Sequence, residues 1–319
     1  MRRYRIIFMG SPEFALPALE AVSSQSLLAV VTRPDRPSGR GLKLSPSAVK
    51  EWALQKGIKI FQPERLKGDS VIEELRALNP DFIIVASYGK ILPPEILKIT
   101  QYFCINVHPS LLPKYRGAAP VPWTLINGET ETGVTIFEMN DEMDAGDILV
   151  QKKTSIDPEE DAGTLLKRLA VLGAAALHET IERFGRNEII AKVEQVHSRA
   201  TYAPKLKKED GLINWDMSAP EIHNRIRGLN PWPGAYTFRE GRILKIWRSG
   251  VVGDSSDKPP GTIVDVQKNG IYVQTGRDIL KIGELQLEGG RRISCSDFIV
   301  GHKIERLIKL GMDTGRKND

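Results

Sequence analysis

The segment YFCINVHPSLLPKYRGAAPVPW, residues 102–123, joins a short apolar run to a loop that contains four prolines. Residues 103–107 have the length and composition of a buried strand, and Pro109 cannot continue that strand inside a sheet. Asn106 and His108 are two residues apart, so on an extended chain their side chains share one face at the carboxyl end of the strand. Open α/β sheets bind ligands at this end. The segment therefore predicts a functional site that contains Asn106 and His108.

A histidine that follows a strand is by itself more often structural than catalytic. A second, acidic loop shifts the balance toward a functional site. Residues 133–139 have the pattern of another strand, and residues 140–147 contain four carboxylates. If the two strands are neighbours in one sheet, we expect both loops to emerge at the same end. Asp144 is then the candidate that hydrogen-bonds His108 and sets its tautomer.

These residues carry a resemblance to a known family. Asn106-Val-His108, Ser110-Leu-Leu-Pro113, Gly117, Pro120 and Asp144, in this order and spacing, resemble the signature of the 10-formyltetrahydrofolate-dependent formyltransferases. The longer run SLLPKYRGAAP, residues 110–120, is similar to the branch of the family that acts on transfer RNA. The resemblance extends along most of the chain.

The resemblance implies an enzyme that transfers the formyl group of 10-formyltetrahydrofolate to the α-amino group of methionine on charged initiator tRNA, for translation initiation. The amine attacks directly, so no nucleophilic side chain is required. In this scheme Asn106, His108 and Asp144 are catalytic: they stabilise the tetrahedral intermediate and move protons. The folate contacts that the resemblance implies are made by the turn Ser110, Leu111, Leu112 and Pro113 and by the loop containing Tyr88 and Gly89.

A basic stretch at residues 32–47 separates two predicted elements. Loops of this length inside compact domains are often functional, although composition alone equally favours a solvated loop. The resemblance favours function, since the transfer RNA formyltransferases carry an insertion here that enters the acceptor arm. The expected RNA contacts are Arg36, Arg40 (the principal one) and Lys43, together with Lys205, Lys207 and Lys208, for which a solvated junction is the alternative.

Two domains are predicted, because 319 residues are many for one core. The first residues alternate strand and helix patterns, which is typical of a doubly wound, mostly parallel α/β sheet; the resemblance implies its Rossmann-like formyltransferase form. Short apolar runs between residues 235 and 286 predict a small β-barrel, which the resemblance implies to be oligonucleotide-binding-like, and residues 296–310 predict a final helix. The predicted division is a catalytic domain at 1–200, a linker at 201–208 and an RNA-binding barrel at 209–319.

Composition limits the partners and the location of the protein. No apolar stretch approaches the about 20 residues that span a bilayer, so we expect no membrane partner. Cys104 and Cys295 lack metal-ligand spacing and the five histidines are scattered, so we expect no metal, no disulfide and a cytoplasmic location. The protein is also expected to be a monomer. The net charge of +5 arises in residues 205–319, which hold 20 Lys and Arg against 15 Asp and Glu. A modest basic excess supports nucleic-acid binding only where another feature of the chain also indicates a polyanionic partner.

Other functions use the same three catalytic residues. Glycinamide-ribonucleotide formyltransferases and formyltetrahydrofolate hydrolases lack the basic insertion and the second domain, which argues against both. Nucleotide-amino-sugar formyltransferases keep a similar two-domain plan and are the main alternative. The alternative outside enzymes is an RNA-binding module in which Asn106, His108 and Asp144 are structural.

Overall fold

The computed structural model describes residues 3–38, 43–66, 69–188, 190–302 and 304–311. Its contacts divide the chain into two compact units. Unit 1 comprises Met1–Pro120, Glu131–Ser155 and Leu166–Pro204, and unit 2 comprises Val121–Thr130, Ile156–Leu165 and Lys205–Asp319. Two short segments that precede residue 201 therefore belong to unit 2. The predicted division assigns all residues before 201 to the first domain.

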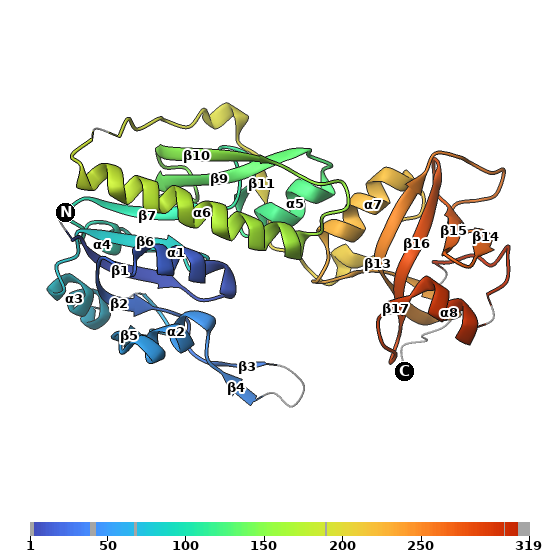
Figure 1. Ribbon diagram of the computed structural model, residues 1–319, viewed down its shortest axis with the longest axis horizontal. Helices are drawn as coiled ribbons and strands as arrows, with labels where there is room; N and C mark the ends of the chain where they lie inside the picture. Colours follow the sequence, from blue (N-terminus) through green and yellow to red (C-terminus); the bar gives the residue numbers. More distant parts are fainter. Residues whose placement is uncertain (1–2, 39–42, 67–68, 189, 303, 312–319) are drawn as a thin grey trace. The chain divides into compact units, whose positions relative to one another are not determined.

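Unit 1 is built on a seven-stranded sheet with the order β10-β9-β7-β6-β1-β2-β5 (Figure 1). The parallel strands are β1 (Arg5–Gly10), β2 (Ser26–Val31), β5 (Ile60–Phe61), β6 (Phe82–Ala86) and β7 (Phe103–His108). β6 is apolar and buried throughout, as expected for a strand covered on both faces. The order reverses between β1 and β6, so the predicted doubly wound, mostly parallel sheet is confirmed.

The remaining strands of this sheet, β9 (Glu131–Glu138) and β10 (Ile148–Ser155), are antiparallel. β9 pairs with β7 so that His108 lies opposite Thr135 and Ile105 opposite Glu138. The expectation that both loops emerge at the same end of the sheet is therefore wrong, because it holds only for parallel neighbours. The loop after β9 starts beside Ile105, about 10 Å along the strand from His108, and must fold back to reach it.

Helices cover the two faces of the sheet in unit 1. They are α1 (Leu16–Val22), which follows a 3-10 turn at Glu13–Ala15, α2 (Ala48–Lys56), α3 (Asp69–Ala77), α4 (Pro94–Leu97) and α6 (Ala162–Gly185). A buried cluster includes Cys104 of β7, Leu75 of α3 and Ile96 of α4. On the other face Val107 packs against α6, where a Cβ at Gly173 would lie 2.7 Å from Val107 Cγ1. Alternation along the strand then directs Asn106 and His108 to the face that is not covered by α6.

Short strands complete unit 1. The predicted basic loop contains an antiparallel hairpin of β3 (Arg36–Ser38) and β4 (Lys43–Ser45), which projects from the sheet in Figure 1. Arg40 lies outside the described residues, as does the side chain of Lys43. β8 (Arg116–Gly117) pairs in parallel with β11 (Tyr202–Ala203).

Unit 2 contains a second, antiparallel sheet with the order β12-β13-β16-β15-β14, and β17 pairs with β16. Its strands are β12 (Ala235–Arg239), β13 (Arg242–Val252), β14 (Ile263–Gln267), β15 (Gly270–Gln274), β16 (Ile279–Leu287) and β17 (Ile293–Ser294), accompanied by α5 (Pro120–Ile126), α7 (Ala219–Gly228) and α8 (Cys295–Gly301). The predicted strand-rich second domain is confirmed. Within the described residues, the pairings do not include one that closes the sheet into a barrel.

The prediction of a helix over residues 296–310 is wrong beyond Gly301. His302 has an extended backbone with φ −139° and ends α8. The following chain instead bonds to the start of β14 and the residues just before it: Leu307 donates its backbone N–H to Ile263 O at 2.8 Å, and Leu310 donates to Gly261 O at 2.8 Å. These long-range backbone bonds replace the helical ones and explain the early end of the helix.

Candidate active site

Asn106 and His108 lie on β7 as predicted, at the carboxyl end of the parallel strands. Asn106 is half-buried and His108 is buried, with 4% of its surface exposed. The Asn106 amide has no hydrogen-bond partner among the described side chains and backbone groups, whereas the chain holds His108 on several sides. An amide N–H at a strand end is therefore available to a ligand.

The orientation of the His108 ring is set by a backbone carbonyl. Its Nε2 lies 3.0 Å from Tyr115 O, and because a carbonyl only accepts, Nε2 carries the proton and donates. The ring also meets Phe137 edge-on at 6.4 Å between centroids. Nδ1 lies 3.7 Å from Asp144 Oδ2, which is beyond hydrogen-bond range. Tyr115, rather than Asp144, therefore sets the tautomer, and the expected hydrogen bond between Asp144 and His108 is replaced by a longer charge contact.

Asp144 is fixed from its own backbone and from a neighbouring strand. Its φ is +53°, in the left-handed region. Its Oδ2 accepts a hydrogen bond from the Gly117 backbone N–H at 2.8 Å. The turn that carries it is tight, because a Cβ at Gly146 would lie 1.8 Å from Glu138 O. These contacts bring the loop after β9 back to His108 although the strands are antiparallel.

The turn of Ser110, Leu111, Leu112 and Pro113 is rigidly supported by β9 and β10. Thr135 Oγ1 donates to Ser110 O at 2.7 Å and accepts from the Leu112 N–H at 3.1 Å. Gln151 Nε2 donates to Leu112 O at 2.7 Å. The Ser110 hydroxyl donates to Lys114 O at 2.7 Å, so it is already used within the loop. What the turn offers a ligand is a fixed shape and partly exposed Leu111 and Pro113.

The loop that begins at Tyr88 is held by its carbonyl groups. Arg33 donates from Nε to Tyr88 O at 2.8 Å and from Nη2 to Gly89 O at 2.7 Å. The Tyr88 ring is 1% exposed within the core cluster, and burial raises the pKa of Tyr88 to about 12, against the opposing effect of Arg33. The Tyr88 hydroxyl has no partner within the described part of the chain. The loop therefore turns the Tyr88 side chain into the core, and Arg33 occupies the carbonyl groups of Tyr88 and Gly89.

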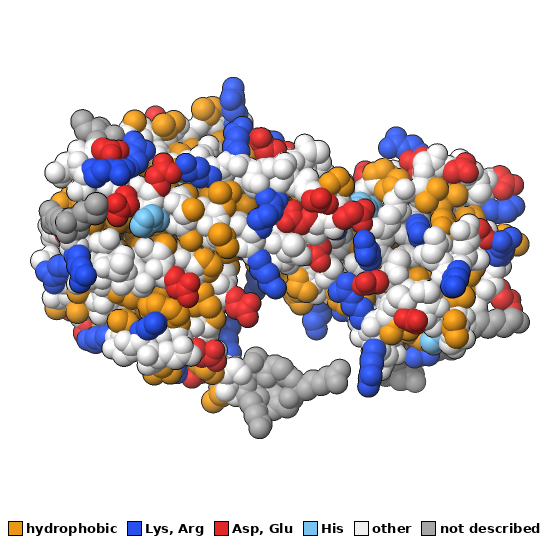
Figure 2. Space-filling model, viewed as in Figure 1, with side chains coloured by type: hydrophobic (Ala, Val, Ile, Leu, Met, Phe, Trp, Pro, Cys, Tyr) orange, Lys and Arg blue, Asp and Glu red, His pale blue; other side chains and the backbone are white. Residues whose placement is uncertain are grey.

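The predicted RNA-contacting residues that the structure describes are all at the surface. Arg36, Lys205, Lys207 and Lys208 are exposed. On the face shown in Figure 2, basic and acidic side chains are interspersed and form no large patch of one sign. On this face, binding of a polyanion would depend on particular basic side chains rather than on a uniform field.

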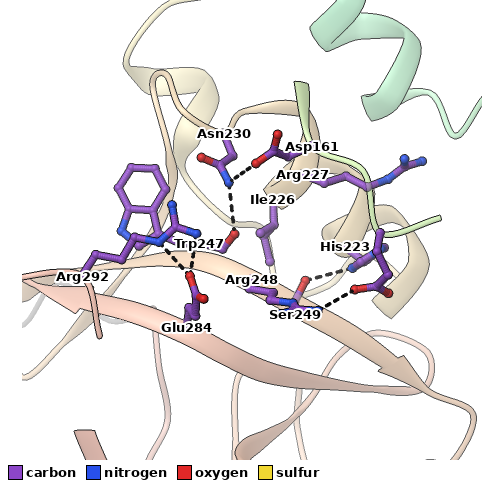
Figure 3. Close-up of a pocket in the computed structure, with 11 residues that line it drawn as sticks. Asp161, His223, Ile226, Arg227, Asn230, Trp247, Arg248, Ser249, Glu284 and Arg292 are labelled. Carbon is purple, nitrogen blue, oxygen red and sulfur yellow. Dashed lines mark hydrogen bonds and ion pairs between the residues drawn. The ribbon is translucent and has the colours of Figure 1, made fainter. Parts of the chain in front are cut away.

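A polar pocket lies in unit 2 (Figure 3). It is lined by Glu159, Asp161, His223, Ile226, Arg227, Asn230, Trp247, Arg248, Ser249, Glu284 and Arg292. Its polar groups pair with one another: Asn230 Nδ2 donates to Asp161 Oδ2 at 2.8 Å, and the His223 ring lies 3.1 Å from Ser249 Oγ. Asp161 Oδ1 also accepts from the Thr164 N–H at the start of α6. The bond between Asn230 and Asp161 anchors residues 156–165 to the rest of unit 2. None of the predicted site residues lines this pocket.

The structure adds residues to the site that the sequence analysis did not identify. They support the predicted ones through long-range hydrogen bonds: Arg33, Tyr115, Arg116, Thr135, Gln151 and Gln195. Tyr115 and Arg116 fall inside the motif at 110–120, but no signal distinguishes them there. Gln195 follows a segment without periodic pattern, so nothing in the sequence marks it. Among the described residues no group of His, Cys, Asp and Glu could hold a metal ion, and none of the described helices is long and apolar enough to cross a membrane.

Comparison with known proteins agrees with this geometry. Residues 4–181 match the formyl transferase family, and residues 205–303 match the formyl transferase C-terminal domain. Among solved structures, a sugar 3N-formyl transferase, WlaRD, superimposes with a TM-score of 0.65 at 18% identity and covers 88% of this chain and 98% of its own. HypX from Aquifex aeolicus, in complex with tetrahydrofolic acid, gives a TM-score of 0.61 at 15% identity over 100% of this chain and 50% of its own. These likenesses show the fold.

The chain belongs to the formyl transferase family and is an enzyme that transfers one-carbon formyl groups. Its sequence relatives within that family are methionyl-tRNA formyltransferases. The protein of that name from Caldanaerobacter subterraneus subsp. tengcongensis is 48% identical over 303 residues, which cover 94% of this chain and 97% of the relative. The one from Alkaliphilus oremlandii is 48% identical over 309 residues, covering 96% and 99%.

Proposed function

We propose that this protein transfers the formyl group of 10-formyltetrahydrofolate to the α-amino group of methionyl initiator tRNA, as a cytoplasmic monomer that serves translation initiation. The observation that carries the proposal is the 48% identity with methionyl-tRNA formyltransferases over 94% of the chain. That identity includes both units, whereas the solved sugar formyltransferase is only 18% identical.

Asn106 stabilises the charge that develops during the transfer. Attack of the amine on the formyl carbon produces a tetrahedral centre with a negatively charged oxygen. The Asn106 amide is half-buried, lies at the strand end and is not engaged elsewhere in the described chain. A fixed donor aimed at such an oxygen contributes about 3 kcal/mol.

The tetrahedral intermediate collapses when the bond between the formyl carbon and N10 breaks, and tetrahydrofolate leaves. His108, with Asp144 beside it, accepts the proton that the attacking amine releases and returns a proton to N10. Because His108 Nε2 is bound to Tyr115 O, proton exchange takes place at Nδ1, which faces the Asp144 carboxylate at 3.7 Å. When the ring is protonated, both nitrogens are donors and the carboxylate stabilises the imidazolium. A separation of 3.7 Å is within the range of an ion pair once the ring is protonated. Asp144 therefore orients and charge-stabilises the ring.

The described residues fit a bound reduced folate, which supplies the formyl group. The rigid turn of Ser110, Leu111, Leu112 and Pro113 adjoins the catalytic histidine, and Arg33 fixes the Tyr88–Gly89 loop through two hydrogen bonds to its carbonyl groups. The Asn106 amide, which has no partner among the described residues, supplies the donor that a formyl oxygen requires. Folate is thus held mainly by the fixed shape of the two loops.

The RNA is held by basic side chains on both units. We assign phosphate contacts to Arg36, Arg40 and Lys43 of the basic stretch and to Lys205, Lys207 and Lys208, which we call the lysine strip. Residues 209–319 are the proposed RNA-binding domain. Contacts of this kind go to phosphates and fix the register of the acceptor stem. Binding therefore weakens steeply as salt is added.

The molecule that accepts the formyl group distinguishes the proposed function from that of a nucleotide-amino-sugar formyltransferase. Purified protein and 10-formyltetrahydrofolate are incubated with methionyl initiator tRNA, methionyl elongator tRNA, the uncharged RNA and a nucleotide-linked amino sugar, and formyl product is measured by mass. We expect product only with charged methionyl RNA, with the initiator preferred. Transfer to the amino sugar and not to RNA would overturn the proposal. Sedimentation of the protein at assay concentration tests the monomer.

A further inference from the structure

We infer that Gln195, held by Arg116, is a positioning residue for the transfer reaction, and that it acts through Asp144. Gln195 is 3% exposed and its side-chain amide is fully engaged. Nε2 donates to Asp144 O at 2.9 Å and to Gly146 O at 2.7 Å. One amide group therefore fixes both ends of the turn that presents the Asp144 carboxylate. The inference rests on the proposed catalytic role of Asp144.

Arg116 fixes the other end of the Gln195 side chain. Its Nε and Nη2 donate to Gln195 Oε1 at 3.1 and 2.7 Å. The forked guanidinium thereby determines which end of the amide is the oxygen, so that the NH2 group must point to the two carbonyls. Arg116 is itself 3% exposed and is anchored by its backbone N–H, which donates to Thr201 O at 2.8 Å.

Three consecutive residues of one strand region thus determine the geometry of the proposed catalytic pair. Tyr115 O receives the His108 Nε2 proton, the Arg116 side chain holds Gln195, and the Gly117 N–H holds the Asp144 carboxylate. The positions of His108 and Asp144 are therefore both fixed by the backbone of residues 115–117. The Tyr115 and Gly117 bonds hold the side chains of His108 and Asp144. Among these contacts of the described residues, only Gln195 binds the backbone of the Asp144 turn.

This clamp is needed because of the direction of β9. The Asp144 loop leaves the sheet about 10 Å from His108, and Asp144 adopts a positive φ. The Gly117 bond restrains one carboxylate oxygen, and the Glu138 N–H ties the end of the turn through Asp147 O at 2.9 Å, whereas Gln195 binds the carbonyl group of Asp144 itself. Displacement of a catalytic group by about 1 Å costs on the order of 100-fold in rate, so the two bonds from Gln195 matter for turnover and not only for stability.

The test is a double-mutant cycle between Gln195→Met and Asp144→Asn. Methionine keeps the length and volume but removes both donors and the acceptor. Gln274→Met is the matched control, because Gln274 is 4% exposed and its Nε2 also donates to two carbonyls, Thr275 O at 2.8 Å and Asp278 O at 3.4 Å, in unit 2. Each folded variant is assayed for kcat and for the KM for the folate donor.

We expect Gln195→Met to lower kcat about 10- to 100-fold with KM changed less than about threefold, and Gln274→Met to leave kcat unchanged. In the Asp144→Asn background, Gln195→Met should cause little further loss, because its route of action is already removed. Equal losses in both backgrounds, or an unchanged kcat in Gln195→Met, would overturn the inference. If Asp144→Asn alone retains full activity, the proposed function of Asp144 fails instead.

A second variant keeps the test decisive if Gln195→Met does not fold. Gln195→Glu retains the volume and forms an ion pair with Arg116, but it presents acceptors to the two carbonyls that Nε2 now satisfies. We expect the same pattern of kcat loss with a smaller loss of thermal stability. Wild-type kcat in folded Gln195→Glu would contradict the inference.

Discussion

The backbone N–H of Gly117 donates to Asp144 Oδ2 at 2.8 Å, and the same oxygen lies 3.7 Å from His108 Nδ1. A glycine of the loop that follows β7 therefore positions the carboxylate that faces the histidine at the end of β7. His108 is tied to the preceding residues of the same loop through Tyr115 O. The sequence motif at 106–117 thus acts as one structural piece, in which the loop returns to hold the residues of its own strand.

Gly117 should tolerate no side chain. Its φ is +117°, and a Cβ would lie 2.8 Å from Ala203 O. Gly57 is a matched control, since its φ is +64° and a Cβ would meet nothing within 4 Å. We expect Gly57→Ala to cost about 1–2 kcal/mol of unfolding free energy, and Gly117→Ala to cost at least about 1 kcal/mol more. Urea denaturation measures both, and equal costs would show that the contact with Ala203 is unimportant.

Thr135 should be required for the shape of the turn at residues 110–113, the proposed folate-binding turn. It is 0% exposed and bonds both Ser110 O and the Leu112 N–H. Thr135→Val removes the hydroxyl and leaves those buried groups unpaired, which costs about 1–3 kcal/mol, and it should raise the KM for the folate donor severalfold.

The control for this change is Thr237→Val, in unit 2. Thr237 is also 0% exposed and accepts from Trp215 Nε1 at 3.0 Å. We expect a similar loss of stability with no change in the KM for the folate donor. If both variants raise KM equally, the effect of Thr135→Val reflects general destabilisation rather than the turn.

The lysine strip should contribute to RNA affinity through charge. Replacing Lys205, Lys207 and Lys208 by Gln removes three exposed cations. If all three contact phosphates, the slope of log K against log salt concentration falls in magnitude by about 2–3. The control replaces Lys56, Lys59 and Lys153, which are exposed in unit 1, by Gln with the same change in net charge. Equal slopes for the two triple variants would show that the lysine strip does not contact the RNA.

Much of the fold could be predicted from the sequence because it rests on local patterns. The apolar run of β7 and the five turn-separated strands from β12 to β16 appear where periodicity and turn residues placed them. The direction of β9 could not be predicted, since strand periodicity is the same in parallel and antiparallel sheets. The helix after residue 296 was predicted too long, because the bonds of residues 307–310 to residues 261–263 are long-range.

The sequence could predict the proposed catalytic side chains of the candidate site, but not the residues that support them. Asn106, His108 and Asp144 were identified by motif and chemistry, and the structure brings His108 and Asp144 to 3.7 Å. Gln195 lies 51 residues after Asp144, in a segment with no pattern of its own. A buried amide that binds two distant carbonyls has the same sequence signature as a solvated glutamine, so only the folded chain identifies it.

The most direct test of the account is the single-turnover rate of formyl transfer to methionyl initiator tRNA, at saturating folate and RNA. It is measured for the wild type and for Asn106→Ala, His108→Ala and Asp144→Asn, each shown to be folded by thermal denaturation. We predict losses of about 100-fold or more for each variant, with the affinity for the RNA unchanged. A His108→Ala protein that transfers formyl at the wild-type rate would contradict the catalytic role of this site.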